Sequence, residues 1–116
     1  MSSSTIAEAN DAVLVATEKA SQVSFARVAP SAVSIEQTIT APGVGKRKHP
    51  VILANAKGET LFAWTENMGW NKGGSLAWQL YGVDQKPAEK GTARDVPVWS
   101  LPTGFAKSNG DFVLVY

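Results

Sequence analysis

Side chains suited to binding chemistry gather in three short segments of this chain. They are Lys46, Arg47, Lys48 and His49; Asn67, Trp70, Asn71 and Lys72; and Arg94, Asp95 and Trp99. Guanidinium and ammonium groups form charge-assisted hydrogen bonds with anions, and indole rings offer flat apolar surfaces with one polar atom. Together they suit a carbohydrate or a small anionic ligand. The candidate binding residues are Arg47, His49, Trp70, Asn71, Lys72 and Trp99.

Each of these features also has a purely structural interpretation. A basic run in a glycine-containing loop needs no ligand, because solvated charge runs are common. Trp70 and Trp99 could instead fill gaps between neighbouring sheets, although Trp70 lies in a polar, glycine-rich segment that is not typical of a core. His49 could form a structural hydrogen bond to a neighbouring loop.

Catalytic groups are harder to find. Glu18 and Glu66 occupy equivalent ends of two repeated segments, and repetition at matched places indicates a structural role. No two carboxylates stand out as a general acid and base couple. The chain contains one histidine and no cysteine, so the sequence predicts no histidine- or cysteine-built metal centre and no cofactor.

The bulk composition narrows the partners further. The 116 residues are 44% apolar, typical of one folded domain, and carry a formal net charge of +1 from 11 basic and 10 acidic residues. No global field would draw the protein to nucleic acid or to an anionic membrane. The apolar runs are too short to span a bilayer. The segment from Met1 to Thr5 lacks the features of a secretory signal, and the compartment stays open.

The elements that must position these residues are repeated strands. The segment from Ala54 to Glu66 is echoed by Ala7 to Glu18 and by Ala106 to Tyr116, at a spacing of about 50 residues, which is typical of propeller blades. Period-two alternation, β-branched residues and intervening prolines predict strands and no helix. The expected strands cover 4–9, 12–18, 23–29 and 33–41; 50–56, 60–67, 75–82 and 87–93; and 103–108 and 111–116.

These strands define one all-β domain, 1–116, with repeats at about 4–42 and 50–93 and a half-repeat at about 103–116. Tight hairpin turns are expected at Asn10-Asp11, Lys57-Gly58 and Asn109-Gly110. In an antiparallel meander, successive connections alternate between the two ends of the sheet. All the candidate binding residues therefore fall in connections at one end, opposite those hairpin turns.

Two and a half four-stranded units would leave the faces of the stack uncovered, because repeats of this kind bury their faces against neighbours. Either copies of the chain associate into a closed ring, or the units belong to a longer six-bladed propeller. Three copies of two blades would give six blades, a common closure number. The expected partner is thus the chain itself, as a homo-oligomer such as a trimer, or further blades.

The repeated segments resemble the sialidase-like β-propellers, also called neuraminidase or BNR-repeat proteins. The resemblance rests on segments 23–28, 45–50, 58–66, 73–79 and 97–102, covers almost the whole chain, and corresponds to the last two and a half blades of such a propeller. It implies the fold and a carbohydrate ligand. The Asp box of that family is absent at Val83 to Pro87. Arg27, Arg47 and Arg94 lie in a strand and two loops at non-equivalent repeat positions, so no catalytic role transfers to them.

Three interpretations remain open from the sequence. The first is a non-catalytic sialidase-like module that holds a carbohydrate or small anion on its loop end. The second is a fragment of a glycoside hydrolase whose active site needs further blades or symmetry mates. The third is a structural or assembly module without a ligand.

Overall fold

The protein is built entirely from antiparallel strands in the residues that the computed structural model describes, which are 4–9, 12–29, 34–43 and 45–116. Within these ranges there is no helix, and hence none that could span a lipid bilayer. The strands are β1 (Ser4–Ala9), β2 (Ala12–Lys19), β3 (Gln22–Ala29), β4 (Ser34–Thr40), β5 (Arg47–Ala54), β6 (Thr60–Glu66), β7 (Gly74–Tyr81), β8 (Pro87–Val96), β9 (Thr103–Ala106) and β10 (Phe112–Val115).

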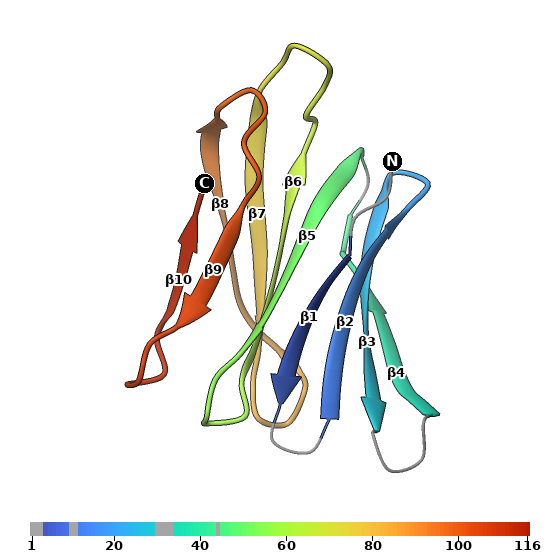
Figure 1. The fold of residues 1–116 in the computed structure, drawn as a ribbon, viewed down its shortest axis with the longest axis vertical. Helices are drawn as coiled ribbons and strands as arrows, with labels where there is room; N and C mark the ends of the chain where they lie inside the picture. Colours follow the sequence, from blue (N-terminus) through green and yellow to red (C-terminus); the bar gives the residue numbers. More distant parts are fainter. Residues whose placement is uncertain (1–3, 10–11, 30–33, 44) are drawn as a thin grey trace.

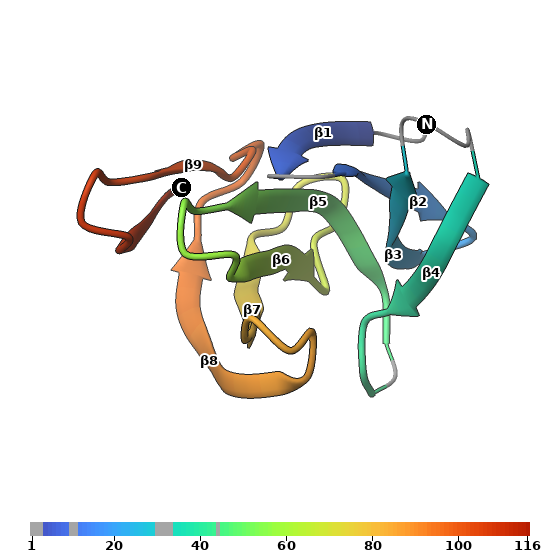
Figure 2. The ribbon, with the colours of Figure 1, turned by 90° about the horizontal axis from the view of Figure 1, so that it is seen from below.

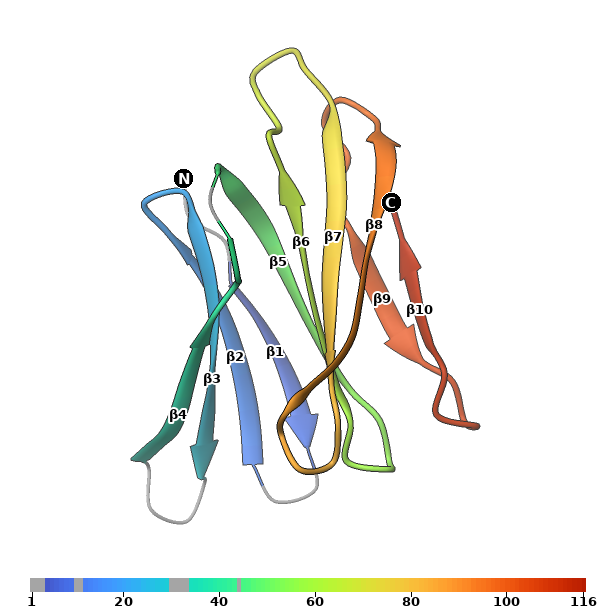
Figure 3. The same ribbon diagram turned by 180° about the vertical axis from the view of Figure 1, so that it is seen from behind.

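The strands form three separate sheets that lie side by side (Figure 1). Two are four-stranded meanders with the orders β1-β2-β3-β4 and β5-β6-β7-β8, and the third is the hairpin of β9 and β10. The sheet of β5 to β8 stands in the middle, with the first sheet on one side and the hairpin on the other (Figure 3). The three sheets stay open, and no sheet closes on itself. The fold is therefore all-β, as the sequence predicts.

The first strands of the three units lie next to one another. β5 contacts β1 on one side and β9 on the other, and the view along the strands shows the three in a row (Figure 2). The remaining strands of each sheet extend away from this row. The arrangement places equivalent elements of successive repeats in equivalent positions.

An aromatic cluster holds the first two sheets together. Phe25 of the first sheet lies 5.0 Å from Phe62 and 5.4 Å from Tyr81 of the second, measured between ring centroids, in edge-to-face geometry. Trp64 packs against Phe62 at 5.1 Å. All four side chains are buried, because alternate residues of β3, β6 and β7 point into this interface. Trp64 thus packs between the first two sheets.

The opposite face of the second sheet packs on the third sheet, the hairpin of β9 and β10. Val51 and Ala63 are paired across β5 and β6, share this face and belong to its buried cluster. Leu114 of β10 packs against that cluster. Gly104 allows the close approach, because a Cβ atom there would lie 2.9 Å from Leu53. Trp78 also lies on this face but is only partly buried.

Three tight turns at one end of the molecule share one hydrogen-bond pattern. In each, the N–H of the first residue donates to the carbonyl of the residue four positions later, at 55 and 59, 82 and 86, and 107 and 111. Gly58 and Gly110 supply the positive φ that this turn requires, and Gln85 adopts it in the third. The predicted turns at Lys57-Gly58 and Asn109-Gly110 are confirmed. The predicted turn at Asn10-Asp11 lies outside the described residues, as do residue 33 and the segment from Met1 to Ser3.

The second sheet is longer than predicted. It begins at Arg47 rather than near residue 50 and ends at Val96 rather than near residue 93. Pro50 lies inside β5, at a bulge between Lys48 and Val51 where the ladder shifts register. A bulge accommodates proline within a strand, so proline did not mark the boundary here. The placement of Arg47 and Arg94 in loops is accordingly wrong, because both lie in strands.

Candidate functional site

The connections that carry the candidate binding residues meet at one end of the molecule. The β4–β5, β6–β7 and β8–β9 connections lie at the upper end in Figure 1, and the tight turns lie at the lower end. This follows from the meander topology, since each strand reverses the direction of the one before. The loops differ in length and composition from the tight turns, so this end holds the chemically varied surface.

A cavity of about 410 Å³ opens between these connections. Its volume lies within the range of small-ligand sites. The start of β5, the β6–β7 loop and the β8–β9 loop each contribute to its wall. The lining residues are Lys48, His49, Met68, Gly69, Trp70, Trp99 and Leu101. Three of the six predicted binding residues, His49, Trp70 and Trp99, are therefore brought together here.

Trp70 and Trp99 form an exposed pair of rings. Their centroids lie 4.9 Å apart and the ring planes are nearly perpendicular, at 89°. Trp70 is 83% exposed and Trp99 is 67% exposed, so neither ring is part of a core. Trp70 lies in a tight turn closed by hydrogen bonds between Gly69 and Lys72. The two indoles offer apolar surface in two directions at the mouth of the cavity.

Trp99 is held in a backbone conformation that disfavours a bulky side chain. The N–H of Ser100 donates to the carbonyl of Pro97, and Trp99 in this turn has a φ of 67°. Glycine is the residue that such a position favours, and other residues pay about 1 kcal/mol or more. Strain of this kind is concentrated at functional sites. An exposed tryptophan at a position suited to glycine therefore points to a role for its ring.

His49 is one of the two polar side chains that line the cavity, the other being Lys48, and its backbone N–H is bound by the first sheet. It follows Lys48 at the β5 bulge, has a φ of 54°, and its N–H donates to the Glu18 carboxylate at 3.0 Å. A bulge redirects side chains relative to a regular strand. Here it turns the ring of His49 toward the loop end, where it lines the cavity.

The hydrogen bonds of Thr65 determine which nitrogen of His49 carries the proton. The Thr65 hydroxyl donates to the Lys48 carbonyl at 3.0 Å, so its oxygen accepts a hydrogen bond from the Nδ1–H of His49, at 3.1 Å. Nδ1 therefore carries the hydrogen in the neutral ring, and Nε2 is the acceptor. A ligand that donates a hydroxyl hydrogen matches this arrangement.

The surroundings of His49 favour the uncharged ring. Burial lowers the pKa of His49 below its ordinary value, and the neighbouring Lys48 ammonium lowers it further, while the Glu18 carboxylate opposes this trend. Burial is the largest of these effects because the charged ring loses contact with water. Near neutral pH the cavity therefore presents a hydrogen-bond acceptor rather than a positive charge at this position.

Arg47, another predicted binding residue, points away from the cavity. Its side chain is 2% exposed, and its guanidinium donates to the Ala41 and Pro42 carbonyls and to Gln22 Oε1. These acceptors belong to the β4–β5 connection and to the start of β3. Arg47 thus links the second sheet to the first. Of the basic residues in this segment, Arg47 is buried and Lys48 lines the cavity.

The remaining predicted residues lie beside the cavity without lining it. Asn71 and Lys72 are exposed in the same turn as Trp70. Glu18 and Glu66 have structural partners, because Glu18 accepts from the His49 backbone and Glu66 accepts from the Trp64 indole at 3.1 Å.

Sequence reasoning missed four lining residues, which are Lys48, Met68, Gly69 and Leu101. Lys48 was visible within the basic run. The other three carry no signal that marks a ligand site.

Acidic and metal-ligating groups are not assembled here. None of the residues that line the cavity is a carboxylate. In the part of the chain that the structure describes, no three histidine, cysteine or acidic side chains are grouped in a way that could hold a metal ion. The chemistry within reach is stacking, apolar contact and hydrogen bonding.

Comparisons of the chain with protein-family models, with curated proteins and with solved structures find no match. The functional argument therefore rests on the geometry of the cavity.

Proposed function

We propose that this chain is a carbohydrate-binding β-propeller module, and that the cavity between His49, Trp70 and Trp99 is its binding site. The observation that carries the proposal is the pair of exposed indoles around a cavity that is also lined by a neutral histidine. Sugar rings combine an apolar face of C–H groups with hydroxyls at their edges. The indole rings match the apolar face of a sugar, and His49 matches its hydroxyls.

Stacking would supply most of the binding energy. A sugar ring lying on one indole can also contact the edge of the second, because the ring planes of Trp70 and Trp99 are perpendicular. Met68 and Leu101 extend the apolar wall. The rings are preorganised by short hydrogen-bonded turns, which lowers the entropic cost of binding.

The polar groups favour a neutral sugar over a small anion. His49 Nε2 can accept one hydroxyl hydrogen, and the Lys48 ammonium can donate to a ring or hydroxyl oxygen. Only Lys48 brings a positive charge, since Arg47 is buried elsewhere. A single lysine beside a neutral imidazole is a weak anion site compared with a bidentate arginine. The absence of a lining carboxylate supports binding rather than hydrolysis, because glycosidases use a pair of carboxylates.

The propeller part of the proposal is supported by the row of β1, β5 and β9 and by the equivalent stacking of successive sheets. It is also supported by apolar residues on the two outer faces. Ile6 and Ile35 are 71% and 68% exposed on the first sheet, and Phe105 and Val115 are 53% and 51% exposed on the third. Further blades, from copies of this chain or from other chain segments, would cover these faces.

A glycan array tests the site. The wild-type protein is expected to bind at least one class of neutral glycan, and Trp70→Ala is expected to lower that signal about fivefold or more, because stacking on one aromatic ring contributes on the order of 1 kcal/mol or more. Val83→Ala is the matched control, since Val83 is an exposed apolar residue in a turn at the opposite end of the molecule. Equal binding by wild type and Trp70→Ala would remove Trp70 from the site.

A further inference from the structure

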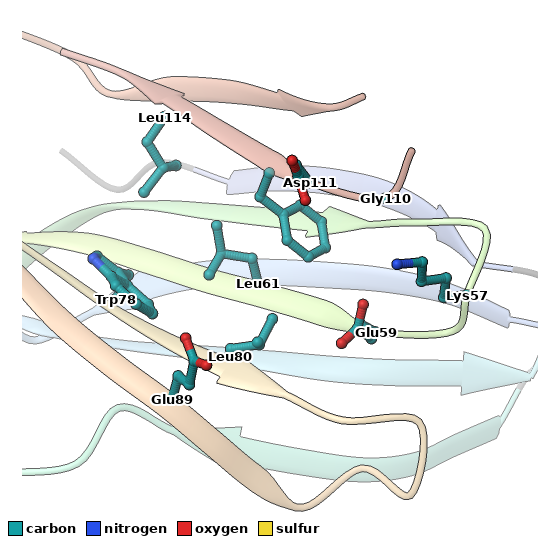
Figure 4. Close-up of a pocket in the computed structure, with 10 residues that line it drawn as sticks. Lys57, Glu59, Leu61, Trp78, Leu80, Glu89, Gly110, Asp111 and Leu114 are labelled. Atoms are coloured by element: carbon teal, nitrogen blue, oxygen red, sulfur yellow. The ribbon is translucent and has the colours of Figure 1, made fainter. Parts of the chain in front are cut away.

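The third sheet presents an edge strand beside a partly apolar cavity, at a distance from the proposed sugar site. Among the described strands, β10 pairs only with β9. Beside its other edge lies a cavity of about 610 Å³, framed by β10, the β5–β6 and β9–β10 turns and the face of the second sheet (Figure 4). Its lining residues are Lys57, Glu59, Leu61, Trp78, Leu80, Glu89, Gly110, Asp111, Phe112 and Leu114.

The floor of this groove is apolar. Leu61 and Leu80 are directly paired across β6 and β7, and Trp78 is the next residue of β7 on the same face. Trp78 and Leu80 are partly exposed there, whereas Leu61 is buried, and Figure 4 shows the three side chains along this face of the second sheet. The opposite face of the same strands is buried under the first sheet. The second sheet thus has one covered face and one that β9 and β10 cover in part.

From these observations we propose that the groove beside β10 binds an extended peptide strand supplied by another polypeptide. Backbone groups at a free strand edge pair readily with an incoming strand, and strand addition to a sheet edge is a common mode of peptide recognition. The internal precedent is direct, because β3 pairs with β2 and β7 pairs with β6 in the same position relative to their units. Alternate apolar side chains of the bound strand would lie on the partly exposed Trp78 and Leu80.

The charges of the groove define the chemistry of the strand. Glu59, Glu89 and Asp111 line it together with one basic residue, Lys57. A strand that carries lysine or arginine among its apolar residues complements this surface. An acidic strand is disfavoured by like charges.

A symmetric pair of this chain does not fit the groove. In an antiparallel pair of β10 strands, the twofold axis is perpendicular to the paired sheet. The faces of the two hairpins that pack on their second sheets would then point in the same direction. The second sheet lies on that side and extends beyond β10, since residues of β7 and β8 line the groove. The second sheets of the two copies would then overlap. This excludes a symmetric β10 pair, and the occupant that we propose is an extended strand of another polypeptide.

A synthetic peptide with the sequence of residues 22–29 is a suitable probe, because β3 is the third strand of the first unit. Its Val23, Phe25 and Arg27 share one face and provide apolar contacts and one positive charge. We expect it to bind with chemical-shift changes at the Phe112–Val115 amides and at the Trp78 indole N–H. The same peptide with Arg27→Glu should bind at least tenfold more weakly at low ionic strength, where charges are least screened.

Matched protein variants locate the site. Glu89→Lys should weaken peptide binding about tenfold at low salt, and high salt should reduce the difference. Glu8→Lys changes a carboxylate on the first sheet that is also exposed, and should leave binding unchanged.

Three results would overturn the proposal. They are no binding at millimolar peptide, equal effects of the two variants, and shifts centred on β2, which would indicate exchange with β3. A concentration-dependent shift of the β10 amides without peptide would identify a second copy as the occupant instead.

Discussion

At the residue scale, His49 links the fold to the proposed chemistry. Its backbone N–H is held by Glu18 and its ring by Thr65, so both its position and its tautomer are determined by residues outside the cavity. These two partners belong to different sheets. The acceptor nitrogen that a sugar hydroxyl needs is therefore a consequence of how the first two units pack.

Sugar binding should depend on pH through His49. Its pKa is lowered in the folded protein, so Nε2 accepts hydrogen bonds at pH 7 and loses this capacity as the pH falls through the lowered pKa. We expect the dissociation constant of a bound glycan to rise several-fold there, since one hydrogen bond contributes about 1 kcal/mol. Titration calorimetry between about pH 4.5 and 7.5 measures this.

His49→Asn provides the control for that titration, because asparagine tolerates a positive φ and does not titrate. Its residual binding should not vary through the same pH range, and a variant that retains the pH dependence of the wild type would assign that dependence to another group.

The stability of the fold should depend on pH in the same direction as sugar binding. A lowered histidine pKa favours the folded state fully above the unfolded value near 6.5, and this contribution is lost as the pH falls toward the folded pKa.

At the element scale, the strands could be predicted from the sequence because their signals are local. Alternation of apolar residues and turn residues such as Gly58 and Gly110 determine where strands start and stop. The start of β5 was mispredicted because Pro50 lies at a bulge, and a bulge depends on pairing with β6. The burial of Arg47 depends on carbonyls of the preceding connection and on Gln22, which no local pattern reveals.

The cavity could be predicted in part for the same reason. Meander topology alone places the β4–β5, β6–β7 and β8–β9 connections at one end, which was enough to group His49 with Trp70 and Trp99. The burial of the Arg47 side chain, and the positions of Met68 and Leu101 in the cavity wall, depend on side-chain packing between units. Such contacts join residues far apart in the chain and produce no recognisable pattern of residue spacing in the sequence.

Arg47 should be important for stability rather than for binding. We expect Arg47→Ala to lower the free energy of unfolding by about 3 kcal/mol, because it leaves buried carbonyl and amide acceptors without their donor. Chemical denaturation followed by circular dichroism measures this. Arg94→Ala is the matched control, since Arg94 is exposed on β8, and should change the stability by no more than about 0.5 kcal/mol. Equal effects of the two substitutions would contradict the structural role of Arg47.

At the scale of the whole molecule, the exposed apolar faces of the first and third sheets dominate the expected behaviour. Ile6 and Ile35 on one side and Phe105 and Val115 on the other are large side chains at more than half exposure. Contiguous exposed apolar surface marks interaction sites. Inside the chain, such faces bury one another, as the contact between Phe25 and Phe62 of the first two sheets shows.

The propeller proposal predicts self-association when no other blades are supplied. The chain mass is 12.3 kDa, and light scattering coupled to size exclusion should give a discrete multiple of it, such as a trimer. Ile6→Lys should shift the population toward smaller species, because it places a charge on the outer face of the first sheet. A single compact monomer at high micromolar concentration would contradict closure by copies of this chain.

The most direct test of the sugar site is a titration of the protein with its strongest glycan-array ligand, followed at the tryptophan indole N–H signals in a ¹H–¹⁵N spectrum. The chain has four tryptophans, of which Trp70 and Trp99 border the cavity, Trp64 is buried between sheets, and Trp78 borders the groove beside β10. The account predicts saturable shifts at Trp70 and Trp99 with Trp64 and Trp78 unchanged. Shifts at Trp78 alone, or no shift at Trp70 and Trp99 at saturating glycan, would contradict it.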